Sequence, residues 1–277
     1  MNVRPAMRIG FHSGALYRSH IGVAIDKVAA AGYDAIELNA EAPHRHVTPA
    51  LSADERRLLR RRAAEAGLAI SAVSAHVSLV DADPEARRAN LDYALGCVEM
   101  ASDVGTRVAH LISGKAAHGL AQQDAWGWLA EGAARCVERG EAVGVRVGFE
   151  AVVNQLVHDM DGLNRLTRAV APLPLYANFD PSHYHVHGAD PVAVVRALGP
   201  RIVHVHLKDA RGAPEDFQFP PLGRGDVDLR GVATALAETG YGGVLSVEYE
   251  ADDFGYHESE DAVIVGSLAF VRGLLGA

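Results

Sequence analysis

The sequence predicts an α/β protein folded as a single (β/α)8 TIM barrel, on three observations. Strand-like apolar runs alternate with helical patterns along the 277 residues, and a barrel of this kind needs roughly 250 residues. A hydrophobic content of 49% is enough for one large core. Neither GxGxxG nor a P-loop follows the first strand, which disfavours a doubly wound open sheet. We therefore expect one domain over 1–277, with 1–6 as a short N-terminal tail.

Each strand is expected where an apolar run is bounded by glycine, proline or polar residues. The expected strands are 7–14, 33–40, 68–78, 107–112, 145–152, 175–180, 201–209 and 244–250. The expected helices are 21–32, 52–67, 83–105, 126–140, 161–170, 191–198 and 229–239. The strict alternation of the two kinds of element is the order expected of a parallel barrel.

Local signals justify the first three helices. Ile21 and Ile25 share one helical face, and Gly32 ends that helix. Ser52 stands three residues before a glutamate, which is the spacing of a capping box. Asp83 followed by Pro84 is typical of an N-cap and a first helical residue. The later helices are expected from their apolar periodicity.

Composition and charge exclude several kinds of partner. The 26 Lys and Arg against 35 Asp and Glu leave a net charge of −9, and the arginine-rich run at 56–62 is expected to be a solvated helix face rather than a phosphate-binding patch. Cys97 and Cys136 lie in helical patterns, which favours free thiols and a reducing compartment. The N-terminus resembles no signal peptide, and an apolar run of transmembrane length is missing. We expect a cytoplasmic protein that binds neither membrane nor nucleic acid; homo-oligomerisation is left open.

Several strands alternate in polarity, although parallel barrel strands are normally apolar on both faces. Val203 and Val205 share one face of the run at 201–209, and His204 and His206 share the other. Polar side chains expected in the barrel lumen are Glu37, Asn39, Glu150, Asn178, Asp180, His204, His206, Lys208, Ser246, Glu248 and Glu250. Buried carboxylates cost several kcal/mol each when unpaired, so this lumen implies a bound cation or a dense hydrogen-bond network.

Four of these residues form the expected metal site. Glu150, Asp180, His206 and Glu248 stand near the carboxyl ends of successive strands, the rim where barrel enzymes carry their chemistry. Three carboxylates and one imidazole suit a divalent metal, with Mn²⁺ expected first and Mg²⁺, Co²⁺ or Zn²⁺ as alternatives. The competing interpretation is that Glu150 and Glu248 form salt bridges. Their partners would then be Arg146, Lys208 or Arg211.

Other polar residues are candidates for substrate contacts. His183, His76 and His12 follow or end expected strands and are predicted to line the pocket, together with Lys208 and Arg211. For His110 and His204, a packing role is favoured, and contact with the site is left open. Tyr184, His185 and His187 are expected in a loop. The segment 215–228 is expected to be a lid-like loop.

These motifs resemble the xylose-isomerase-like TIM-barrel superfamily of sugar phosphate isomerases and epimerases. The likeness runs from IGFHSG to SVEYE, and its most specific segments are NFDPSH, HVHLKD and PLGRGDVD. The resemblance implies that Glu150, Asp180, His206 and Glu248 bind one divalent metal and that His183 contacts substrate. Endonuclease IV, a member of this superfamily, adds an Asp-x-His pair after strand seven, but 210–228 contains no histidine. Ketose 3-epimerases place a glutamate where this chain has Leu156.

The predicted reaction is isomerisation or epimerisation of a ketose or related polyhydroxy-carbonyl compound through an enediolate. Glu150 and Glu248 would exchange the proton next to the carbonyl. The expected partner is therefore a small sugar or cyclitol. A dehydratase of the inosose or dehydroshikimate type, an endonuclease IV-like phosphodiesterase and a non-catalytic sugar-binding barrel remain alternatives. The acidic stretch after 244–250 would repel a phosphate group and therefore predicts a substrate without phosphate. Arg211 and Arg224 argue against this prediction, because they could supply the positive charge that binds a phosphate.

Overall fold

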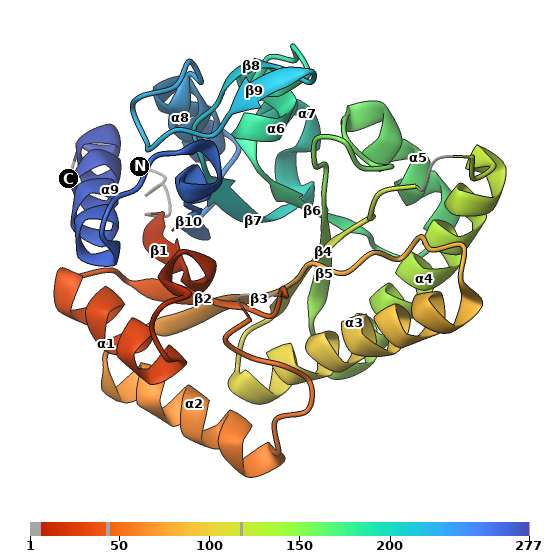
Figure 1. Cartoon of the computed structure of the whole chain (residues 1–277), viewed down its shortest axis with the longest axis horizontal. Coiled ribbons are helices and arrows are strands. Elements are labelled where there is room, and N and C mark those ends of the chain that lie inside the picture. Colours follow the sequence, from red (N-terminus) through yellow and green to blue (C-terminus); the bar gives the residue numbers. More distant parts are fainter. Residues whose placement is uncertain (1–6, 43–44, 117–118, 277) are drawn as a thin grey trace.

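Eight parallel strands close into a barrel surrounded by helices, so the fold prediction is confirmed (Figure 1). The computed structural model describes residues 7–42, 45–116 and 119–276, and the predicted tail at 1–6 lies outside them. The barrel strands are β1 (Arg8–His12), β2 (Ala35–Asn39), β3 (Ala69–Ala75), β4 (Val108–Ile112), β5 (Arg146–Glu150), β6 (Tyr176–Phe179), β7 (Ile202–Leu207) and β10 (Val244–Val247). Their order around the barrel is β1-β10-β7-β6-β5-β4-β3-β2.

Helices form the outer layer, and every helix expected from the sequence is present. The helices are α1 (Ile21–Ala31), α2 (Ala53–Glu65), α3 (Pro84–Val104), α4 (Gln122–Val143), α5 (Met160–Val170), α6 (Pro181–Val186), α7 (Pro191–Leu198), α8 (Leu229–Glu238) and α9 (Glu260–Leu275). Short 3₁₀ turns are η1 (Ser13–Leu16), η2 (Gly199–Arg201) and η3 (Ala251–Phe254). None of the helices within the described ranges combines the length and the apolarity needed to cross a membrane.

The capping signals act as predicted. The Ser52 hydroxyl accepts from the backbone N–H of Glu55, whose carboxylate accepts from the backbone of Ser52 in return. Asp83 caps α3 ahead of Pro84. Gly32 follows α1 with φ of 93°, a left-handed conformation that suits glycine and lets its N–H bond to the last turn. Each signal involves residues close in sequence, which is why it could be predicted.

Three segments differ from the prediction. Tyr184 and His185 lie in α6 rather than in a loop, because Asp180 and Pro181 start a short helix directly after β6. The expected lid-like loop at 215–228 begins at the turn of a two-stranded hairpin, β8 (Arg211–Ala213) and β9 (Asp216–Gln218), so its residues 216–218 form a strand. The helix α9 was not expected. It begins at an N-cap serine, Ser259, and packs against α1 and α8, which closes the helical layer.

Apolar and polar faces of the strands separate as predicted, with one correction. Val205 and Leu207 join the core between the barrel and the helices, and His204 and His206 are buried in the lumen. Val203 does not share the outer face of Val205. The pairing of β6 with β7 shifts register at this point, and Val203 instead packs with Ala72 and Val108. A bulge of this kind inserts one residue and re-aims its side chain.

Candidate metal centre and cleft

Four side chains converge at the carboxyl end of the barrel. Glu150 ends β5, Asp180 follows β6, His206 lies in β7 and Glu248 follows β10. One potential ligand atom from each of the four lies within 4.8 Å of the others, and no residue in the group is more than 5% exposed. The structure therefore brings together the complete set predicted from the sequence.

Local hydrogen bonds orient these side chains. Asp180 caps α6, and its Oδ1 accepts from the backbone N–H and the hydroxyl of Ser182 at 2.7 and 2.6 Å. Its second oxygen is thereby left for the centre. The Oε2 of Glu150 lies 2.6 Å from Nε2 of His110, which leaves Oε1 for the same space. His110, for which a packing role was favoured, therefore holds a carboxylate of the site.

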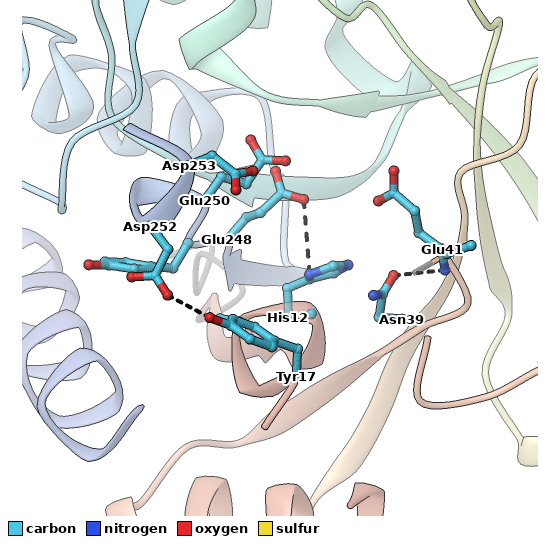
Figure 2. Close-up of a pocket in the computed structure, with 12 residues that line it drawn as sticks. His12, Tyr17, Asn39, Glu41, Glu248, Glu250, Asp252 and Asp253 are labelled. Atoms are coloured by element: carbon cyan, nitrogen blue, oxygen red, sulfur yellow. Dashed lines mark hydrogen bonds and ion pairs between the residues drawn. The ribbon is translucent and has the colours of Figure 1, made fainter. Parts of the chain in front are cut away.

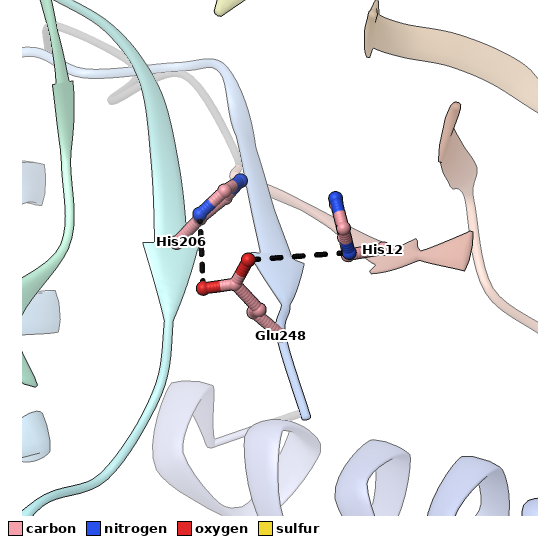
Figure 3. A group of neighbouring side chains, drawn as sticks. All are labelled: His12, His206 and Glu248. Carbon is pink, nitrogen blue, oxygen red and sulfur yellow. Dashed lines mark ion pairs between the residues drawn. The ribbon is translucent and has the colours of Figure 1, made fainter. Parts of the chain in front are cut away.

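Three inward-facing atoms fit a cation. Within the described part of the chain, Glu150 Oε1, Asp180 Oδ2 and His206 Nδ1 are buried without a hydrogen bond, and Asp180 Oδ2 forms an ion pair with the ammonium of Lys208, at 3.1 Å. The same His206 nitrogen lies 3.2 Å from Glu248 (Figure 3) and 3.8 Å from Glu150. Buried polar atoms are normally paired, so lone pairs aimed at one space indicate a missing partner. Oxygen and imidazole donors are the set that Mn²⁺, Mg²⁺ or Zn²⁺ accepts.

Neighbouring positive groups keep the two buried glutamates of the centre ionised. Burial raises the pKa of Glu150, but His110 and His206 outweigh it and hold that pKa well below 4.5. Glu248 behaves in the same way, with burial opposed by His206 and Lys208. Burial raises the pKa of Asp180 to about 6, against the attraction of Lys208. Both glutamates are therefore ionised at neutral pH and able to accept a metal or a proton.

Lys208 supplies a positive charge beside the centre. Its ammonium nitrogen lies 2.6 Å from Glu248, 2.8 Å from Glu250 and 3.1 Å from Asp180. The salt bridge considered from the sequence therefore exists for Lys208 and Glu248. Arg146 instead lies over the ring of Tyr176. Burial lowers the pKa of Lys208, but these carboxylates raise it well above 10.5, so the ammonium stays charged.

The predicted substrate-contacting histidines surround the centre. His183 Nδ1 accepts from the backbone N–H of Val153, and its Nε2 lies 3.3 Å from the ammonium nitrogen of Lys208, 3.6 Å from Glu150 and 3.7 Å from Asp180. His76 lies 3.9 Å from Glu150 through Nε2 and is held by Glu41 at 2.8 Å through Nδ1. Burial and Lys208 lower the pKa of His183 to about 3, so this imidazole is neutral beside the two carboxylates.

His12 completes this ring, whereas Arg211 does not join it. His12 Nδ1 lies 4.0 Å from Glu248, and burial lowers the pKa of this histidine to about 4 (Figure 3). Arg211 lies in the hairpin, and its guanidinium donates to the carbonyl oxygen of Arg224. Arg224 in turn pairs with Glu258 at 3.2 Å. Both arginines therefore bond to residues outside the candidate metal centre.

Two cavities adjoin the centre. The larger, of about 500 Å³, lies between β1, β2 and η3, and Figure 2 shows His12, Asn39, Glu41 and Glu248 around it. The smaller, of about 220 Å³, reaches Glu150, His183 and Lys208. Its outer wall is aromatic and consists of Phe217, Phe219 and Phe254. The centre thus lies at the base of a cleft with acidic and aromatic sides.

Sequence reasoning missed the role of one buried acid. Glu37 on β2 is fully buried, and its carboxylate lies 2.7 Å from Nε2 of His204 and 3.1 Å from Nε2 of His206. The alternation of polarity placed Glu37 in the lumen, but the sequence carries no signal for which strand it would face. His204 therefore shares this carboxylate with the histidine of the centre, and their rings lie edge to face with centroids 5.6 Å apart.

Comparison with known proteins places the chain in a family. Inosose dehydratase from Lacticaseibacillus casei is 28% identical over 144 residues, 47% of this chain and 48% of the relative; the chain thus spans about half the length of that protein. Fructoselysine 3-epimerase from Shigella flexneri is 23% identical over 250 residues, 87% and 90% of the two chains. The crystal structure of the IolI protein with a bound zinc atom superposes with a TM-score of 0.79 at 17% identity, covering 98% of both chains. The family described as Xylose isomerase-like TIM barrel matches residues 25–274, and this chain belongs to it.

Proposed function

We propose that this protein is a divalent-metal-dependent isomerase or epimerase of a ketose or related polyhydroxy-carbonyl compound. The observation that carries the proposal is the convergence of Glu150, Asp180, His206 and Glu248, with buried lone pairs aimed at one space beside a cleft. The similarity to fructoselysine 3-epimerase supports the reaction class. The IolI neighbour was crystallised with zinc, which supports a metal at such a site, and Mn²⁺ is the ion we expect here.

The chemistry follows from the placement of the two glutamates. A divalent cation held by the four residues would supply Lewis-acid polarisation of two neighbouring substrate oxygens. Glu150 and Glu248 follow β5 and β10, which are separated by β6 and β7, so their carboxylates can approach different faces of one carbon. One takes the proton next to the carbonyl. The other returns a proton to the opposite face, giving an epimer, or to the neighbouring carbon, giving an isomer.

A dehydratase is the second candidate, and His76 is the observation that favours it. Burial lowers the pKa of His76, but Glu41 and Glu150 raise it to about 9, so the imidazole is protonated at neutral pH. His76 lines the smaller cavity and can donate that proton to a departing hydroxyl. The similarity to inosose dehydratase is in line with this outcome.

Solvent exchange tests the reaction. Incubation in D₂O with a panel of ketoses, inososes and small keto-acids should place deuterium on the carbon next to the carbonyl of the true substrate, and the product identifies epimer, isomer or dehydrated compound. Glu248→Gln should lower turnover by at least about 10²-fold. Cleavage of abasic DNA without exchange would contradict the proposal in favour of an endonuclease. Binding of a sugar without any exchange or turnover would favour a non-catalytic barrel.

Metal dependence has its own test. We expect elemental analysis to find a divalent metal, chelation to remove activity, and Mn²⁺ to restore it. Asp180→Asn and His206→Ala should weaken Mn²⁺ binding in calorimetry. If both variants bind Mn²⁺ like the parent protein, the assignment of these ligands is wrong.

A further inference from the structure

Glu37 occupies the layer of the lumen beneath the candidate metal centre. It belongs to β2, whereas His204 and His206 belong to β7 on another side of the barrel. The Glu37 carboxylate, His206 and His110 are fully buried, and His204 is 2% exposed. A buried charge in such a position is stable only when it is paired. The pairing of Glu37 therefore constrains the side chains around it.

The contacts of Glu37 select one orientation of the His206 ring. His206 Nε2 lies 3.1 Å from both carboxylate oxygens of Glu37, so this nitrogen carries a proton and donates it. Its other nitrogen, Nδ1, then faces Glu150 and Glu248 at 3.8 and 3.2 Å. A flipped ring would lose the bonds to Glu37. The contacts with Glu37 thereby keep Nδ1 of His206 facing Glu150 and Glu248, on the side of the candidate metal centre.

His204, on the same strand as His206, also bonds to the Glu37 carboxylate. Its Nε2 lies 2.7 Å from Oε2 of Glu37, so two imidazoles share one carboxylate. Both imidazoles contact Oε2 and His206 also contacts Oε1, so a neutral amide would turn its N–H₂ donor toward at least one of them in either orientation. The arrangement requires a carboxylate, because both imidazole nitrogens that face it are donors.

We propose that Glu37 is a positioning residue that orients His206 for metal binding. This inference rests on the proposed metal-dependent function. Carboxylates that accept the second N–H of a metal-binding histidine fix its tautomer and raise its basicity, and their loss typically costs about 10–100-fold in metal affinity. Glu37 itself contributes no ligand atom to the four-residue centre.

Metal binding measured without turnover tests the inference. Mn²⁺ affinity would be determined by calorimetry for the parent protein, Glu37→Gln, Glu37→Asp, His206→Ala and His204→Gln, each first shown to be folded by circular dichroism. We expect Glu37→Gln to weaken binding by about 10–100-fold. Glu37→Asp keeps the charge on a shorter side chain and should give an intermediate affinity. His204→Gln keeps a side-chain donor beside Glu37 and leaves Glu37 and His206 together, so it should weaken Mn²⁺ binding less than Glu37→Gln does.

The outcomes separate the two proposals. If the parent binds no divalent metal, the metal centre itself is wrong, and the role of Glu37 falls with it. If the parent binds Mn²⁺ and His206→Ala does not, but Glu37→Gln matches the parent, only the role of Glu37 is wrong. Should Glu37→Gln fail to fold, ¹⁵N histidine spectra of the Zn²⁺-loaded parent decide: a proton on His206 Nε2 supports the inference, and a proton on Nδ1 overturns it.

Discussion

Lys208 places its ammonium nitrogen 2.6 Å from Oε2 of Glu248, although the two residues follow different strands of the barrel, β7 and β10. The same nitrogen lies within 3.1 Å of Asp180 and within 2.8 Å of Glu250. One buried cation therefore pairs with three carboxylates at the rim of the candidate metal centre. This arrangement predicts how stability depends on both the lysine and a metal.

Replacing Lys208 with Met should destabilise the metal-free protein by about 3–5 kcal/mol, because buried carboxylates lose their partner. Urea unfolding in the presence of a chelator measures this. Excess Mn²⁺ should reduce the difference in stability between variant and parent, because the variant lacks the competing ammonium and should bind Mn²⁺ more tightly, and tighter binding to the folded state stabilises it more. The control is Arg196→Met, which breaks a half-exposed pair with Glu238 and should cost less than about 1 kcal/mol. Equal effects of the two variants would contradict the prediction.

The substrate is predicted to carry no phosphate. Among the described residues that line the two cavities, Lys208 is the one Lys or Arg, and carboxylates already hold it. The acids lining the cavities are Glu41, Glu150, Glu248, Glu250, Asp252 and Asp253. Their field repels a dianion. The measurement is kcat/KM for a free ketose and for its phosphate ester.

A tenfold or larger preference for the ester, worth about 1.4 kcal/mol, would refute this prediction. Asp253→Lys supplies a matched test of the cause. Asp253 lines both cavities and is exposed, so a cation there should move the ratio of the two constants toward the ester. An unchanged ratio would mean that charge at the cleft is not what selects the substrate.

Asp209 is predicted to hold the loop after the β8–β9 hairpin. Its buried carboxylate accepts from the backbone N–H groups of Gly223, Gly225 and Val227 at 2.9, 2.9 and 3.2 Å. Asp209→Asn turns a side-chain N–H₂ group toward these backbone N–H groups. It should lower the free energy of unfolding by about 1.5–3 kcal/mol, the contribution of a hydrogen bond to a charged group. Hydrogen exchange should then accelerate across 219–228.

Asp190→Asn is the control for this loop. Asp190 is an exposed helix cap, and asparagine caps a helix about as well as aspartate, so stability should hardly change. Normal protection of 219–228 in Asp209→Asn would show that other contacts keep the loop in place.

Glu260 is predicted to make stability depend on acid pH. It accepts from Lys27, from the Ser19 hydroxyl and from the backbone N–H of Arg18. Burial raises the pKa of Glu260, but the hydrogen bonds of Lys27 and Ser19 outweigh it and lower the pKa below 4.5. A lowered folded-state pKa contributes stability above the unfolded pKa, and this stability is lost as the pH falls through the folded pKa.

Glu260→Gln should therefore lower the free energy of unfolding by about 1–2 kcal/mol at pH 7. The difference from the parent should shrink as the pH falls below about 4.5, because the parent then loses the same charge. Denaturant unfolding across pH 3 to 7 checks this. A difference that stays constant with pH would show that ionisation of Glu260 is not its source.

The sequence by itself determined the barrel and the set of residues at its centre. The capping pairs Ser52–Glu55 and Asp83–Pro84 lie close in the chain, and side chains alternate along a strand with a period of two. Such local rules also place Glu150 and Glu248 at the carboxyl ends of their strands. They do not specify contacts between distant strands.

Only the tertiary structure decided which buried groups meet. Glu37 and His206 are 169 residues apart, and their contact depends on how β2 and β7 are brought across the lumen when the barrel closes. The register shift that turns Val203 away from Val205 arises from the pairing of β6 with β7. Lys208 and Arg211 looked equivalent along the chain, but one enters the lumen and the other bonds to a neighbouring loop. Strand closure, register and loop path are properties of many residues together, so no short pattern encodes them.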